Sequence, residues 1–135
     1  MIVTIPRLGY AVAVIFLGLA TVSAQTAVSS PNDYKKHMDD VQESKDDLTD
    51  AVDNKNSEQA IATSRKLAEL LHADIDYWKT KKVDQAVELA NSSYDLVVQI
   101  GAHAKRNDFV AARNSILQLQ NKCRACHDAH PEKRQ

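Results

Sequence analysis

The feature that most limits what this chain can fold into is the near absence of glycine and proline after its first 31 residues. Only Gly101 and Pro131 follow that point, out of three glycines and three prolines in a chain of 135 residues. Both residue types interrupt helices and mark turns, so their scarcity favours long helices. Alanine, leucine, lysine and other helix formers fill the same stretch. We therefore expect an all-α fold without strands.

Four helices are predicted from the spacing of the apolar residues, which recur at intervals of three and four positions. Short polar side chains precede three of these stretches, and such side chains satisfy the free N–H groups of a first helical turn. The predicted capping residues are Asn32 or Asp33 for the first helix, Ser57 for the second and Asp108 for the fourth.

Short links join the predicted helices, at residues 54–56, 80–82 and 106–107, with the third helix at about residues 84–105. Pro131 ends the fourth helix, because the residue before a proline disfavours helical geometry. Helices of about 22 residues are about 33 Å long. With links this short, each helix runs antiparallel to the next, which predicts an up-down-up-down four-helix bundle.

Both cysteines of the chain lie in one pentapeptide, Cys-Arg-Ala-Cys-His, at residues 123–127. This spacing is typical of a c-type haem attachment site. Cys123 and Cys126 would each form a thioether with a haem vinyl group, and His127 would be the proximal ligand of the iron. We therefore expect one covalently attached haem c near the C-terminus of the bundle.

Two other interpretations compete for these residues. Cys123, Cys126 and His130 are three possible zinc ligands, but a structural zinc site needs a fourth, and zinc has no use for His127 directly after Cys126. A Cys-x-x-Cys pair is also found in redox dithiols and disulfides, but the redox motif expects strands that this chain lacks. We favour haem and expect His130 to face solvent beside the haem edge.

The N-terminus has the pattern of a secretory signal peptide. Arg7 precedes an uncharged apolar run at residues 8–20, and Val-Ser-Ala at residues 22–24 resembles a cleavage site. The run is shorter than the roughly 20 residues of a membrane-spanning helix. We expect residues 1–24 to be removed, residues 25–31 to form a short segment, residues 32–130 to form the domain and residues 131–135 to form a tail. The mature protein would then be periplasmic, with no stable membrane anchor.

The formal net charge of the chain is −1. This balance gives no indication of nucleic-acid binding or of attraction to an anionic membrane. Basic residues do surround the haem motif, and they would either steer an acidic redox partner or be ordinary solvated charges. They are Lys122, Arg124, Lys133 and Arg134.

A signal peptide, four helices and a haem motif at the end of the last helix together resemble the cytochrome c′ family. The resemblance implies a periplasmic haem protein, often a homodimer, in which residues 34–41 cross the distal face of the haem. A basic side chain such as Lys35 or Lys36 would pair with a propionate. Two features differ from the family: the link between the second and third helices is shorter, and Pro131 follows the motif where the family often continues its helix.

The family implies two forms, which differ in the sixth ligand of the iron. In one, a first-helix methionine fills that position and the protein carries electrons. In the other, an apolar side chain blocks the position and the iron binds carbon monoxide or nitric oxide. Met38 lies about 40° to one side of the apolar stripe of the first helix and His37 about 60° to the other, at about 100° per residue. We favour Met38 and keep His37 as the alternative.

The leading functional hypothesis is a periplasmic cytochrome that carries single electrons to or from an unidentified redox partner protein. It is not an enzyme under this hypothesis, because electron carriage needs no substrate turnover. The alternative is a five-coordinate haem protein that binds small gases. A peroxidase is disfavoured, because the sequence offers no distal pair of arginine and histidine.

Overall fold

The computed structural model describes Val28 and residues 30–131, and the hypotheses about residues 1–24 and 132–135 lie outside this range. Four helices account for nearly all of it: α1 (Pro31–Asp53), α2 (Ser57–Lys81), α3 (Asp84–Lys105) and α4 (Phe109–Ala129). No strand occurs among the described residues. The predicted all-α class is confirmed, and so are the bounds of the third helix.

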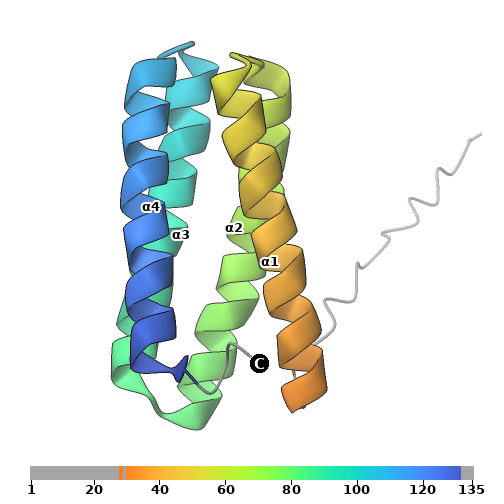
Figure 1. Cartoon of the computed structure of the whole chain (residues 1–135), viewed down its shortest axis with the longest axis vertical. Helices are drawn as coiled ribbons and strands as arrows, with labels where there is room; N and C mark the ends of the chain where they lie inside the picture. The colour runs from red at the N-terminus through yellow and green to blue at the C-terminus, as the bar shows by residue number, and fades with distance from the viewer. Residues whose placement is uncertain (1–27, 29, 132–135) are drawn as a thin grey trace, which may run out of the picture.

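The four helices pack side by side, and each runs antiparallel to the next along the chain (Figure 1). The turns at residues 54–56 and 106–108 lie together at one end, which we call the closed end. The turn at residues 82–83, the beginning of α1 and the last turns of α4 lie at the other, which we call the motif end. Residues from both ends of the sequence lie at the motif end. A site formed by α4 at this end is therefore also next to α1.

The N-terminus of α1 differs from the prediction by two to three residues. Ser30 is the capping residue, and its hydroxyl accepts a hydrogen bond from the N–H of Asp33 at 3.1 Å. The Asp33 carboxylate accepts in return from the N–H of Ser30 at 3.1 Å. The expectation that Asn32 or Asp33 caps the helix is therefore wrong. Asp33 stabilises the same turn from inside the helix, as in a capping box.

The predicted cap of α2 is also displaced, whereas that of α4 is confirmed. Asn56 caps α2 and accepts from the N–H of Gln59 at 3.1 Å. Ser57 instead donates its hydroxyl to the backbone carbonyl of Ala104 in α3, at 2.7 Å. Asp108 caps α4 by accepting from the N–H of Ala111 at 3.0 Å.

Each of the three turns contains a residue with left-handed backbone geometry, and none of the three is glycine. They are Lys55, Lys82 and Asn107, with φ of 54°, 57° and 56°. A side chain in this region costs about 1–2 kcal/mol, less for asparagine. The turns are therefore tight at some cost in conformational energy.

Packing at the closed end is dense. Leu48, Ile100 and Ile116 are completely buried, and alanines at 0% exposure, such as Ala104 and Ala112, let the helices approach closely. Between α2 and α3 the approach is close at Gly101: a Cβ atom added there would lie 2.5 Å from the Ser64 hydroxyl oxygen, so the Ser64 side chain would have to move. The Arg113 guanidinium donates to both carboxylate oxygens of Asp53 at 2.8 Å, which links α4 to α1.

Large aromatic rings pack at the motif end instead. Tyr34 of α1 stacks on Tyr77 of α2 with ring centroids 4.2 Å apart, and Trp78 meets Tyr34 edge-on at 5.7 Å. The His130 ring lies 4.7 Å from that of Trp78. The expectation that His130 faces solvent is therefore wrong, because the indole offers it a flat apolar surface.

No helix within the described part of the chain is both long and apolar enough to cross a bilayer.

Candidate functional site

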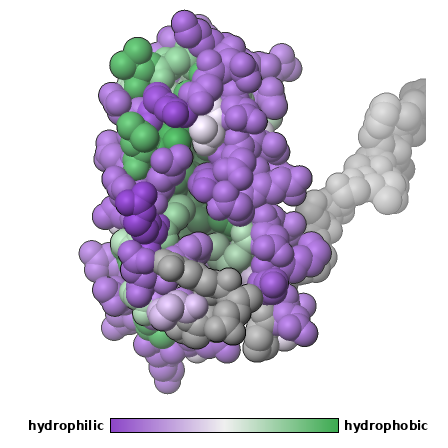
Figure 2. Space-filling model, viewed as in Figure 1, coloured by the Kyte–Doolittle hydropathy of each residue, from purple (hydrophilic) through white to green (hydrophobic). Residues whose placement is uncertain are grey.

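A pocket of about 430 Å³ opens between α1 and α4 towards the motif end. Figure 2 shows a hollow on this face, with apolar side chains at its floor between the polar outer surfaces of the bundle. All four helices contribute to its walls. The lining residues are Tyr34, Lys35, Met38, Asp39, Val41, Gln42 and Lys45 of α1, Leu71 and Asp74 of α2, Leu89, Ala90 and Ser93 of α3, and Cys123, Cys126 and His127 of α4.

The three residues of the haem motif line this pocket together. Cys123, Cys126 and His127 occupy positions i, i+3 and i+4 of α4, and residues at this spacing share one face of a helix. All three are partly buried, and both cysteines are thiols. The sequence thus presents two thiols and an imidazole to one pocket wall.

The Cys123 thiol differs from a redox-active cysteine in its electrostatics. Burial raises the pKa of Cys123, and the positive charge of Lys45 opposes this rise only in part. Catalytic Cys-x-x-Cys sites have lowered thiol pKa values, because the thiolate is the reactive species. This observation disfavours the dithiol interpretation.

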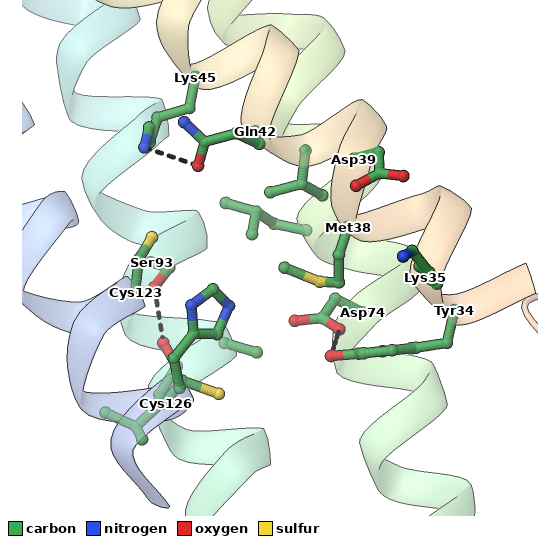
Figure 3. A pocket seen from close by; sticks show the side chains of 15 residues that line it. Tyr34, Lys35, Met38, Asp39, Gln42, Lys45, Asp74, Ser93, Cys123 and Cys126 are labelled. Atoms are coloured by element: carbon green, nitrogen blue, oxygen red, sulfur yellow. Dashed lines mark hydrogen bonds between the residues drawn. The ribbon is translucent and has the colours of Figure 1, made fainter. Parts of the chain in front are cut away.

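Met38 points into the pocket from α1, across from Cys123 and Cys126 (Figure 3). His37, the alternative ligand, does not line this pocket. It is only 6% exposed, and its Nε2 atom is buried without a hydrogen-bond partner among the described residues. Burial lowers the pKa of His37, although Asp40 acts in the opposite direction. Of the two candidates, Met38 is the one presented to the motif.

A buried polar network forms the wall beside Met38. The Tyr34 hydroxyl donates to Oδ1 of Asp74 at 3.0 Å (Figure 3). The Trp78 indole N–H donates in turn to the Tyr34 oxygen at 3.1 Å. Burial raises the pKa of Asp74 from 3.8 to about 6, against the effect of hydrogen bonds from Tyr34 and Trp78. Burial, followed by the Asp74 carboxylate, raises the pKa of Tyr34 well above its ordinary value.

Asp74 is the site residue that the sequence analysis missed. It lies three residues after Leu71 and four before Trp78, both of which are buried. A helical position with this spacing falls on the buried face of α2. An acidic residue on an apolar stripe is therefore the sequence signal that could have identified Asp74.

Lysines occupy the pocket wall on α1. Lys35 lines the pocket, whereas Lys36 does not and pairs with Asp40 at 3.1 Å on the outer surface. Lys45 was not predicted as a site residue. Its side chain is only 16% exposed, and its ammonium donates to Gln42 Oε1 at 2.9 Å.

The zinc arrangement considered from the sequence is not assembled. Within residues 30–131 and Val28, no three side chains of histidine, cysteine, aspartate or glutamate converge closely enough to hold a metal ion. In this structure His130 packs on Trp78.

No family model, curated protein or solved structure matches this chain. The resemblance to cytochromes c′ therefore depends on the expected signal peptide, the helix layout and the motif residues alone.

Proposed function

We propose that the protein is a periplasmic c-type cytochrome that carries single electrons through one covalently attached haem. A single observation carries the proposal: all three motif side chains line one pocket, and Met38 lines the same pocket from the opposite helix. A haem held by this motif must contact both thioether sulfurs and the histidine at once. The pocket presents these groups together.

The size and polarity of the pocket also suit a haem. Its volume of about 430 Å³ falls within the range of roughly 300–1,000 Å³ that is common for cofactor pockets. Its floor is apolar, as at Leu71 and Leu89, and Lys35 and Lys45 offer positive charge for propionates. Charged groups at an apolar pocket fix the orientation of the bound molecule.

Each residue has a separate task under this proposal. Cys123 and Cys126 would hold the haem through two thioether bonds, each formed by adding a thiol across a vinyl group, with the sulfur on one vinyl carbon and the thiol proton on the other. His127 of α4 and Met38 of α1 would be the protein ligands of the iron. The bound haem supplies a reversible ferric–ferrous couple. The helices exclude water and hold these side chains still, which is what an electron carrier requires.

The alternative is a five-coordinate haem that binds nitric oxide or carbon monoxide. Val41 and Leu71 line the same pocket and are apolar. If Met38 packed as a core side chain, these residues would control which molecules reach the iron. The two functions therefore differ in what Met38 does.

Export through residues 1–24 and an unidentified redox partner protein belong to the same proposal. Lys122 directly precedes the motif on α4, and Arg124 lies within it. Their charges favour an acidic partner surface, and electrostatic attraction of this kind mainly increases the rate of encounter. A homodimer is the further expectation from the cytochrome c′ resemblance.

The test is expression of the full chain in a periplasm that contains the haem-attachment machinery. We expect haem that stays with the polypeptide after denaturation and a low-spin spectrum that carbon monoxide does not change. Met38→Ala should convert the spectrum to high-spin, whereas the matched control His37→Leu should leave it low-spin. A high-spin wild type that binds carbon monoxide would replace electron carriage by gas binding. Absence of covalent haem would overturn both.

A further inference from the structure

Asp74 is a buried carboxyl group that no basic side chain among the described residues pairs with. Its side chain is 6% exposed and accepts a hydrogen bond from the neutral Tyr34 hydroxyl at 3.0 Å. None of the salt bridges among the described residues involves it. Buried charges in proteins are normally paired with an opposite charge, because leaving water is costly. Asp74 therefore lacks the countercharge that its position calls for.

Asp74 lines the same pocket as the haem motif. A positively charged group bound in this pocket would therefore lie close to the Asp74 carboxylate. Figure 3 shows Asp74 pointing into this pocket from α2, across from Cys126. Lys35 and Lys45 line it too, but neither forms an ion pair with Asp74 within the described residues. A cation bound in the pocket would supply the balance.

We propose that Asp74 is the countercharge of the oxidised haem and that it holds the reduction potential of this protein low. The inference rests on the proposed function, because it requires haem in this pocket. The core of a ferric haem, which is the iron with the porphyrin dianion and without the propionates at the edge, has a net charge of plus one. Reduction by one electron from a donor makes that charge zero, with no bond made or broken at Asp74. The carboxylate therefore stabilises the oxidised state more than the reduced state.

The expected size of the effect follows from Coulomb's law. At an effective dielectric constant of about 20, two unit charges change an equilibrium at least tenfold out to roughly 12 Å. A pocket of about 430 Å³ has a mean width of about 8 Å, so a group bound in it lies within that range of its walls. A tenfold change in a one-electron equilibrium corresponds to about 59 mV.

Asp74 and the axial ligands act in opposite directions. A methionine–histidine pair raises the potential of a haem. Asp74 would lower the potential through its electrostatic effect alone, without binding the iron. The potential of the wild type would then be a compromise that the identity of the ligands alone does not predict.

The experiment is a potentiometric titration of the haem-loaded full chain at about pH 8, where a carboxyl of pKa about 6 is ionised. Asp74→Asn removes the charge and keeps an oxygen that accepts from Tyr34. We expect the ferric–ferrous equilibrium to shift at least tenfold towards the ferrous state, which raises the reduction potential by about 59 mV or more. The matched control is Asp76→Asn, a carboxylate two residues away whose side chain is 60% exposed, which should shift the equilibrium less than twofold.

A second variant keeps the test decisive if the asparagine protein does not fold. Asp74→Leu also removes the charge and fills a similar volume with apolar atoms. If a folded, haem-bearing Asn or Leu variant has a ferric–ferrous equilibrium constant within twofold of the wild-type value, this inference is overturned and the proposed function stays intact. A wild type that acquires no haem overturns both.

Discussion

The closed end of the bundle is packed with aliphatic side chains and alanines, whereas the motif end is packed with large rings around a pocket. At the closed end Ala104 and Ala112 are fully buried, and Gly101 lies against Ser64. At the motif end Tyr34 and Trp78 enclose a polar network beside about 430 Å³ of unfilled volume. Figure 1 shows α1 leaning away from α4 towards that end.

This difference separates stability from binding within one simple fold. Tight packing at the closed end fixes the relative positions of the helices. The motif end can therefore leave volume for a ligand. Proteins often give up stability at functional sites in this way. We expect substitutions at the two ends to differ in cost, and four measurements on the haem-free chain test this comparison.

The largest expected effect comes from removing a leucine at each end. Leu48→Ala, in the fully buried core, should lower the free energy of unfolding by about 3–5 kcal/mol, because it leaves a new cavity. Leu71→Ala should cost about 1–2 kcal/mol less, since Leu71 already borders a pocket. Urea denaturation of both variants checks this. Equal losses would mean that the motif end is packed as tightly as the closed end.

The next effect is electrostatic and belongs to the motif end alone. The pKa of Asp74 is about 6 in the folded protein against an ordinary 3.8. The folded state therefore binds more protons between these values, and its stability falls as pH rises from about 4 to 6 and stays lower above. The penalty is about 3 kcal/mol at most.

Asp74→Asn should remove this penalty and stabilise the haem-free chain above pH 6. The measurement is the difference between the stability curves of the two proteins against pH. This difference cancels the contribution of His37, whose lowered pKa acts on both proteins alike. A difference that does not change between pH 4 and 7 contradicts the expectation.

A smaller effect is expected at the close approach of α2 and α3. Gly101→Leu should destabilise the protein by about 2 kcal/mol, because its side chain would overlap Ser64. Gly101→Ala should stay within about 1 kcal/mol, since the Ser64 hydroxyl is able to rotate away and alanine favours helix. Thermal unfolding with Ala102→Leu, an exposed neighbour, as the control measures this. If Gly101→Leu leaves the stability unchanged, the helices at the closed end are able to move apart at little cost.

The smallest effect concerns the turns. Lys82→Gly at the motif end should stabilise the protein by about 0.5–1 kcal/mol, because glycine adopts a φ of 57° without strain. Asn107→Gly at the closed end should gain less, since asparagine tolerates this geometry better than lysine. Chemical denaturation of the two variants ranks them, and the reverse order would refute the argument.

The fold was largely predictable because helices without interruptions and with short links have few ways to pack. The third helix was placed correctly at residues 84–105. The caps of α1 and α2 were not, because several short polar residues compete near each of these helix starts, whereas Asp108 was correctly placed as the cap of α4. Ser57 is an example: it is a good cap by type, but its hydroxyl reaches Ala104, which lies 47 residues away in the sequence.

The site was only partly predictable. The motif identified Cys123, Cys126 and His127, and chain topology explains why α1 faces them. Helical angles of about 40° and 60° did not separate Met38 from His37, because both lie near the edge of the stripe. Their surroundings differ only in three dimensions, where Met38 lines the pocket and His37 does not. Asp74 escaped notice because its importance comes from burial.

Trp78 gives the motif end a built-in optical reporter. It is the single tryptophan of the chain, it is 2% exposed, and it contacts both Tyr34 and His130. Its fluorescence therefore comes from this end alone, with the blue emission of a shielded indole. A chromophore bound in the neighbouring pocket would quench that emission by energy transfer. Cofactor loading and local opening of this end are thus observable in the native sequence, without an added label.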